Sequence, residues 1–399
     1  MKNTPLVLLI FAAAAAQALN VLLGNVGKTI TSAGAFPFAQ LAARSGGTRD
    51  LLSFISSAEK GALDVAFIYG TNPAYTAPAY LKFEEKFAKV PFKVVLSQFL
   101  DETAKSADIV LPLTSSLEDW GTHVAAYRPQ QVALQQPLME KLYPETRGLG
   151  DVLLAFVKTR ASSTFAGFND YYAYLREAMI NLPAQYKGDV PADMFWNETV
   201  SKGVMNVPVT AGQLQSNTVA VSFPESKPDA AFPLQLVPVT RLGLWDGRHA
   251  NLPWIQESPD QITKSVWGSW AEIHPATAAS LGVATGDFVT VTSPQGSLTV
   301  PVYVYRGVHP EAVAIPVGQG HEEYGQWATG RGVNPIKLFG NHTDSKTGEL
   351  ATLGTRVKLV KANVKESEKL VRFGGSESQV GRKLVATVKA DVFNRTEGA

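Results

Sequence analysis

Hydrophobic positions between residues 48 and 113 form two kinds of pattern that alternate along the chain. Three short, nearly continuous apolar runs rich in β-forming residues occur at 64–70, 92–99 and 108–113. Apolar residues recur at three- and four-residue spacing in 48–60, with Thr48 as a plausible N-cap, and in 80–90. The runs are typical of buried parallel strands, and the spaced positions indicate amphipathic helices. The order predicts right-handed βαβ crossovers and an α/β domain with a Rossmann-like parallel sheet.

From about residue 232 the pattern changes to period two. A strand is predicted at 288–293, and a Pro-Gln-Gly turn leads from it to a second strand. In that second strand four apolar residues alternate with other types: Leu298, Val300, Val302 and Val304. A short helix is predicted at 276–281. Period two over so many positions, with tight turns, indicates a small β-barrel with one buried face.

Length and composition narrow the class of protein. The 399 residues are enough for two or three domains. The 36 basic and 35 acidic residues give no field that would gather nucleic acid, so no nucleic-acid partner is expected. Cysteine is absent, which rules out an iron–sulfur cluster held by cysteines of this chain. The six histidines show no metal-binding spacing, and no residue is assigned to catalysis or to a metal.

The N-terminal region leaves two interpretations open. Residues 1–20 fit either a secretory signal with an Ala-Gln-Ala cleavage site or an alanine-rich buried helix. The uninterrupted apolar run is too short for a confident transmembrane span, so the chain itself is not expected to be transmembrane. The following stretch VLLGNVGKTI (21–30) is not a phosphate-binding P-loop, because Leu22 stands where the first glycine of that motif belongs.

Polar loops follow the predicted parallel strands, at the edge where such sheets bind ligands. The first of these loops holds Gly70, Asn72 and Pro73. Glycine would let the backbone approach a pyrophosphate, and asparagine can donate to a sugar or phosphate. A proline-stabilised turn in which Asn72 caps its own loop explains the same residues, and this alternative stays open.

Five stretches in this order resemble the C-terminal half of the molybdopterin oxidoreductase superfamily: FIYGTNPAYTAP, LSQFLDETAKSADIVLPLTSSLEDWGT, QQPLMEKLYPETRGLGDVLLAF, AEIHPATAASLGVATGDFVTV and IPVGQGHEEYGQWATGRGVNP. The resemblance implies a Rossmann-like part over 1–165 and an insertion or linker at 166–234. It implies a double-psi-like, molybdopterin dinucleotide-binding-like barrel over 235–360, and a polar tail at 361–399. The large subunits of this superfamily bind a bis-molybdopterin guanine dinucleotide.

The same resemblance gives roles to two further loops. In the family, the loop that opens the helix after the second strand lines the cofactor cleft; here it holds Asp101, Glu102 and Thr103. Helix capping alone also explains these three residues. Relatives place a glycine-punctuated loop beside the pterin, and the candidate contacts in it are Gly318, Gly320, His321 and Asn334.

The loop GQGHEEYGQWATGRGVNP and the tail GRKLVATVKADVFNRTEGA are similar to the molybdopterin-like subunits of quinone-linked complexes, alternative complex III and menaquinone reductase. This likeness implies a structural subunit beside iron–sulfur and membrane subunits of a respiratory complex. It also implies a molybdopterin guanine dinucleotide site that is vestigial or without its cofactor, and membrane association through partners on the periplasmic side. Two alternatives stay open: the C-terminal half of a split polysulfide or thiosulfate reductase type of enzyme that binds the cofactor, and a degenerate fragment that folds poorly.

Overall fold

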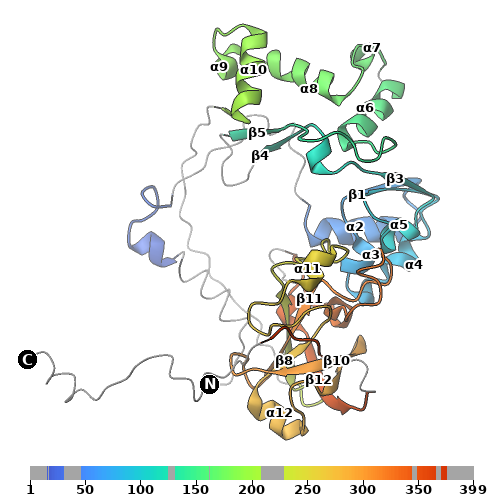
Figure 1. Ribbon diagram of the computed structural model, residues 1–399, viewed down its shortest axis with the longest axis vertical. Coiled ribbons are helices and arrows are strands. Elements are labelled where there is room, and N and C mark those ends of the chain that lie inside the picture. Colours follow the sequence, from blue (N-terminus) through green and yellow to red (C-terminus); the bar gives the residue numbers. More distant parts are fainter. Residues whose placement is uncertain are drawn as a thin grey trace, which may run out of the picture.

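The computed structural model describes residues 16, 18–30, 46–124, 131–160, 162–207, 229–343, 348–364 and 370–374. Residues 1–15 and 17 and most of the predicted polar tail therefore lie outside the described residues, so neither interpretation of residues 1–20 is tested. The described chain contains three sheets, which stack one beyond another along the long axis of the molecule (Figure 1). None of the helices in these ranges is both long and apolar enough to span a membrane.

The first sheet is parallel and has the strand order β1-β2-β3. Its strands are β1 (Val65–Tyr69), β2 (Phe92–Ser97) and β3 (Ile109–Pro112). The helices around it are α2 (Thr48–Glu59), α3 (Pro73–Thr76), η1 (Ala79–Leu81), α4 (Phe83–Phe87) and α5 (Glu102–Lys105). These three strands and the helices between them confirm the predicted βαβ order.

Two local predictions in this region need correction. The helix expected across 80–90 is divided at Lys82, whose φ of 49° places it in the left-handed region and ends η1 before α4 begins. Thr48 is not the N-cap of α2; Gly47 holds that position. The Thr48 hydroxyl instead donates to the carboxylate of Glu349, 301 residues away, at 2.6 Å. Neither change is visible in the spacing of apolar residues.

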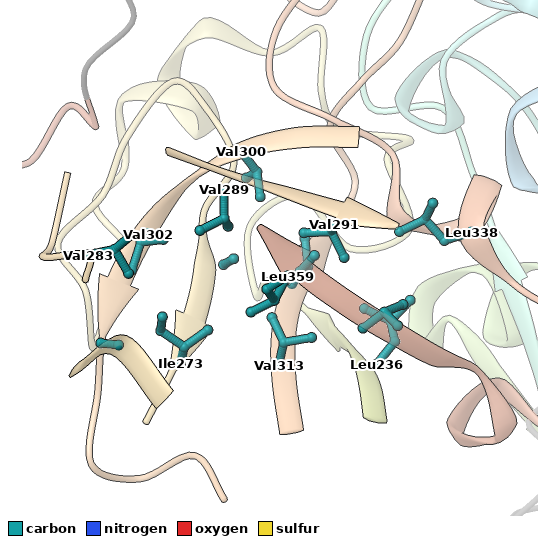
Figure 2. Packing of buried hydrophobic residues seen from close by; sticks show 14 of the residues in the cluster. Leu236, Ile273, Val283, Val289, Val291, Val300, Val302, Val313, Leu338 and Leu359 are labelled. Carbon is teal, nitrogen blue, oxygen red and sulfur yellow. The ribbon is translucent and has the colours of Figure 1, made fainter. Parts of the chain in front are cut away.

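A closed barrel of six strands follows in the order β10-β8-β11-β7-β12-β9. Its strands are β7 (Leu234–Thr240), β8 (Ala271–Ile273), β9 (Phe288–Ser293), β10 (Gly296–Val304), β11 (Ala312–Val317) and β12 (Arg356–Ala362). Alternate side chains, among them Val289, Val291 and Val300, point inward, where they are fully buried (Figure 2). The predicted period-two strands and the helix α12 (Pro275–Leu281) are confirmed. Shorter helical segments are α11 (Pro253–Glu257), η3 (Pro335–Leu338) and η4 (Thr352–Gly354).

Much of the stretch 166–234, which was interpreted as an insertion or linker, packs into a separate hydrophobic core together with residues that precede it. The third sheet is antiparallel and consists of β4 (Gly121–Val124), β5 (Gln131–Gln135) and β6 (Val204–Asn206), after the short helix η2 (Ser116–Glu118). Helices α6 (Leu149–Arg160), α7 (Ser162–Phe165), α8 (Tyr171–Ile180), α9 (Ala184–Lys187) and α10 (Ala192–Lys202) accompany it. Leu175, Met179 and Trp196 pack against the sheet residues Val132 and Leu134. Because β6 pairs with a strand about seventy residues earlier, local periodicity could not reveal this unit.

Candidate functional site

A cleft of about 1010 Å³ opens at the carboxyl ends of the three parallel strands. The loops after β1, β2 and β3 form one wall, helices α6 and α8 contribute another, and the barrel loop 246–249 closes a third side. Four of the residues predicted from sequence line it: Gly70, Asn72, Asp101 and His321. The other predicted residues lie outside the cleft lining: Pro73, Glu102, Thr103, Gly318, Gly320 and Asn334. Several of the predicted residues instead take part in a network of hydrogen bonds between the sheet and the barrel. We call this network of Asn72, Glu102, Thr103, His321 and Asn334 the polar junction.

The sheet side of this junction is a network of three side chains. Asn72 donates through Nδ2 to Glu102 Oε2 at 2.6 Å, and its Oδ1 accepts from the Thr103 hydroxyl at 2.7 Å. Thr103 Oγ1 in turn accepts from the Ala74 backbone N–H at 3.0 Å. Asn72 thus joins the loop after β1 to the start of α5. Asp101 caps α5 by accepting from the Ala104 N–H at 2.7 Å, as predicted from its position.

Glu102 and His321 join this network to the barrel. The Glu102 carboxylate lies 3.1 Å from His321 Nδ1 and accepts the backbone N–H of Glu322 at 2.8 Å. Both side chains are buried, with 8% of the Glu102 residue and 2% of the His321 residue exposed. Burial works to raise the pKa of Glu102, but hydrogen bonds from His321 and Asn72 outweigh it and lower the pKa to about 2. The carboxylate therefore stays ionised in the folded protein.

His321 is held on all sides. Its ring stacks on Tyr75 at 3.8 Å between centroids and 9° between planes, and on Tyr324 at 4.6 Å. Its Nε2 lies 3.2 Å from the carbonyl oxygen of Gly247. Both ring nitrogens thus lie within hydrogen-bonding distance of oxygen atoms, and the ring is fixed in place by these contacts and by the two tyrosine rings.

The glycine-punctuated loop of the barrel packs closely against this junction. Gly320 has φ +83°, and a Cβ at this position would overlap the backbone of Val333 and Asn334, so glycine is required there. Asn334 donates through Nδ2 to the Tyr75 carbonyl at 2.9 Å, and the Tyr75 hydroxyl donates to the Gln319 carbonyl at 2.9 Å. These predicted pterin contacts are hydrogen-bonded within the protein, although a ligand role for them stays a prediction.

Several residues of the site were missed in the sequence. Tyr75 and Tyr324 hold the His321 ring, and Asp246, Gly247 and Arg248 form the barrel loop that closes the cleft. The signal for the loop was present as Asp-Gly-Arg-His within the predicted barrel region 235–360, a polar turn in which the structure gives Gly247 a φ of +107°. A Cβ on Gly247 would overlap the His321 and Tyr75 rings, so this glycine is fixed by the junction.

The charge of the cleft is weakly suited to an anion. Among the described residues that line it, Arg248 is the only arginine or lysine, and it already forms a bidentate pair with Asp246 at 2.9 and 2.7 Å. Burial raises the pKa of Asp101 and of Asp119, which also line the cleft. The volume and the carboxylates suit a base with N–H donors, whereas a pyrophosphate would find little positive charge. No group of three His, Cys, Asp or Glu that could hold a metal occurs in the described ranges.

The described chain thus combines a parallel sheet, a closed six-strand barrel and a cleft that both of them line. Residues 10–141 match the family described as Molybdopterin oxidoreductase, and residues 245–352 match the Molydopterin dinucleotide binding domain. The chain therefore carries a molybdopterin oxidoreductase region followed by a molybdopterin dinucleotide-binding domain. The resemblance deduced from the five sequence stretches is confirmed.

Individual relatives cover most of this chain. It is 29% identical over 358 residues to the menaquinone reductase molybdopterin-binding-like subunit of Nitratidesulfovibrio vulgaris, covering 86% of this chain and 50% of that subunit. It is 24% identical over 420 residues to the arsenate respiratory reductase molybdopterin-containing subunit of Shewanella sp. strain ANA-3, covering 83% and 49%. The assimilatory nitrate reductase catalytic subunit of Bacillus subtilis is 26% identical over 291 residues, covering 68% and 38%. The chain spans about half the length, or less, of these relatives.

A solved structure shares the fold. Acetylene hydratase from Pelobacter acetylenicus aligns with a TM-score of 0.54 and 18% identity, over 77% of this chain and 46% of that one. At this identity the likeness concerns the fold alone.

Proposed function

We propose that this chain is a molybdopterin-like subunit, or part of one, in a membrane-bound quinone-linked respiratory electron-transfer complex, with a structural rather than a catalytic role by itself. The observation that carries the proposal is the use of Asn72, Glu102, Thr103, His321 and Asn334 in hydrogen bonds to one another and to the backbone. Side chains at the level of the cofactor cleft thereby hold the sheet to the barrel. The likeness to a subunit described as molybdopterin-binding-like supports the same role.

The cofactor assignment follows from the cleft. A molybdopterin guanine dinucleotide would be held by the Gly70 backbone, by the carboxylates of Asp101 and Asp119 toward guanine N–H groups, and by Arg248 toward phosphate. Such a cofactor supplies a redox-active metal when it is bound. Because Arg248 is already paired with Asp246, we propose that the site is vestigial and retains the cofactor weakly or not at all.

Metal and pterin analysis of the purified native complex tests this role. Molybdenum and tungsten would be measured by mass spectrometry and pterin by fluorescence after oxidation, each per mole of this chain. We expect amounts far below one per chain. Stoichiometric metal with extractable pterin would instead establish the alternative, the C-terminal half of a split polysulfide or thiosulfate reductase type of enzyme. The retained volume of the cleft favours that alternative.

A matched pair of variants locates any bound pterin. Arg248→Ala removes the guanidinium that lines the cleft, whereas Arg331→Ala removes one that stacks 5.3 Å from the Trp267 ring outside the cleft lining. If a pterin occupies the cleft, Arg248→Ala lowers its retention and Arg331→Ala does not. Equal pterin retention in both variants would argue against the cleft as its site.

The remaining assignments are proposals of the same kind. We propose iron–sulfur and membrane subunits as partners, no iron–sulfur cluster on this chain, and a position on the periplasmic side of the membrane through those partners. The boundaries at 165, 234 and 360 are proposed as domain limits. A double-psi crossing of the barrel strands is supported by two parallel pairings, β8 with β10 and β7 with β11, within an otherwise antiparallel barrel.

A further inference from the structure

A run of large apolar side chains lies exposed between β5 and α6. Residues 137–143 read Pro-Leu-Met-Glu-Lys-Leu-Tyr, and 77% of Leu138, 65% of Leu142 and 64% of Tyr143 are accessible to solvent. Met139 is 47% exposed and Leu117 of the neighbouring η2 is 50% exposed. These five apolar residues are called the apolar ridge: Leu117, Leu138, Met139, Leu142 and Tyr143.

Backbone hydrogen bonds hold the apolar ridge together. The N–H groups of Leu138 and Met139 donate to the carbonyl oxygen of Leu117 at 2.8 and 3.2 Å. The Leu142 N–H donates to Glu118 Oε1 at 3.0 Å. The segment 137–143 is therefore anchored on η2, and its apolar side chains are neighbours in space. Single exposed apolar residues are ordinary, whereas a contiguous group of this kind marks an interaction site.

A pocket of about 430 Å³ opens beside the apolar ridge, and Met139 belongs to both. Among the described residues that line this pocket, five are carboxylates and one is a lysine: Glu118, Asp119, Glu140, Asp151, Asp170 and Lys141. None of the five carboxylates forms an ion pair in the part of the chain that the structure describes. We call it the acidic pocket, because its negative charge has no matching cations.

Backbone groups position these carboxylates without neutralising them. Glu118 Oε2 accepts the N–H of Ser115 at 2.9 Å, and Asp151 Oδ1 accepts the N–H of Tyr171 at 2.8 Å. Hydrogen bonds from the backbone N–H groups of Leu142 and Ser115 lower the pKa of Glu118. Local capping thus explains where the carboxylates lie. It does not explain why so much uncompensated charge gathers next to an exposed apolar surface.

Aromatic rings complete the acidic pocket. Trp120, Tyr171 and Tyr172 line it, and the Trp120 and Tyr172 rings lie 4.8 Å apart at 47°. The stem of a lysine or arginine packs well on such rings while its charged end faces carboxylates. Charge complementarity therefore favours a basic side chain in the pocket, and the apolar ridge favours apolar residues next to it.

We propose that the apolar ridge and the acidic pocket together bind a segment of a partner subunit that combines apolar with basic side chains. Its apolar residues cover Leu138 and Leu142, and a lysine or arginine enters the acidic pocket beside Trp120. The inference rests on the proposed function for the existence of a partner subunit and adds the surface that binds it. Asp119, Trp120 and Tyr171 line both the acidic pocket and the cofactor cleft, so the bound segment lies next to the cleft.

Photo-crosslinking in the native complex tests the proposal. A benzophenone amino acid replaces Leu138 in the full chain, and the control position is Trp254 on α11, which is 83% exposed and belongs to neither the ridge nor the pocket. The captured peptide is sequenced by mass spectrometry. We expect the Leu138 probe, and not the Trp254 probe, to capture a segment of another subunit that carries lysine or arginine among apolar residues. Capture of a segment without basic residues, of a second copy or another part of this chain, or of lipid, or no capture at all, would overturn the proposal.

A charge reversal in the acidic pocket gives a second measurement. Glu140→Lys places a cation where the basic side chain would bind, so recovery of the captured subunit with affinity-tagged chain should fall by about tenfold or more. Glu257→Lys, on α11, is the matched control and should leave recovery unchanged. Exchanging the partner's basic residue for glutamate should restore recovery with Glu140→Lys.

The thermal transition of each variant checks that the chain still folds. Unchanged recovery with Glu140→Lys, or an equal fall with Glu257→Lys, would refute the docking site. Neither readout depends on molybdenum content. Failure of this inference is therefore distinguishable from failure of the proposed structural role, which the metal and pterin analysis decides.

Discussion

The barrel and the parallel sheet solve the same problem of burying apolar side chains in opposite ways. Each barrel strand has two neighbours, and residues such as Val289 and Ile315 are fully buried without help from outside. The sheet has two edge strands, β1 and β3, on which Val65, Phe67 and Ile109 are 45%, 57% and 42% exposed. We therefore expect the barrel to hold its fold more independently, whereas the sheet depends on its polar junction with the barrel.

The largest expected effect comes from a substitution in the polar junction between the sheet and the barrel. Glu102→Gln replaces the buried carboxylate that faces His321 with a neutral amide. The change weakens the hydrogen bonds that Glu102 accepts from His321, Glu322 and Asn72. We expect a loss of about 3 kcal/mol or more in local stability of the sheet, because several hydrogen bonds to one buried carboxylate are weakened together. Hydrogen exchange of sheet and barrel amides measures it separately, because a chain with several units need not unfold in one step.

The control for this variant is an exposed ion pair on the same helix. Lys105 pairs with Glu323 at the surface, and Lys105→Gln should cost less than about 1 kcal/mol. Equal losses in the two variants would mean that the junction is no more than a surface contact. Faster exchange in the barrel than in the sheet would contradict the self-sufficiency of the barrel.

A substitution in the barrel interior tests how tightly the barrel is packed. Ile315→Ala leaves a cavity among fully buried residues of β11, and we expect about 2–5 kcal/mol of destabilisation confined to the barrel. Denaturant-dependent hydrogen exchange of the barrel strands checks the magnitude and its location. Little effect there would show that the interior is loosely packed, against the complete burial of its side chains.

Acid should weaken the junction before it affects the barrel interior. The pKa of Glu102 lies at about 2 in the folded chain, below its ordinary value of 4.5. A depressed pKa means that the carboxylate stabilises the fold fully above about pH 4.5 and progressively less as the pH falls toward 2. The stability difference between the natural chain and Glu102→Gln should therefore shrink across this window. A difference that stays constant from pH 5 to about pH 2 would exclude this carboxylate as the titrating group.

The sequence predicted the strands with a clear local pattern but not their contacts with distant segments. Continuous runs and period-two alternation identified β1, β2, β3, β9 and β10, because these patterns follow from local burial. Residues 72, 102 and 321 were selected as polar loop positions, but their mutual contact joins segments more than 200 residues apart. Tyr75, Gly247 and Tyr324 were missed since each acts through that contact. The exposure of Phe67 and Ile109 was not predicted, because a continuous apolar run looks the same whether one or both of its faces are buried.

The smallest expected effect is that of truncating an exposed side chain of the sheet, in contrast to the buried side chains of the barrel. Phe67→Ala removes a ring that is 57% exposed and makes one edge-on contact with Phe156, so the isolated chain should lose less than about 1 kcal/mol. The thermal stability of the isolated chain measures this loss. A large loss would mean that the Phe67 ring is packed within the chain, and the sheet would then be as self-contained as the barrel.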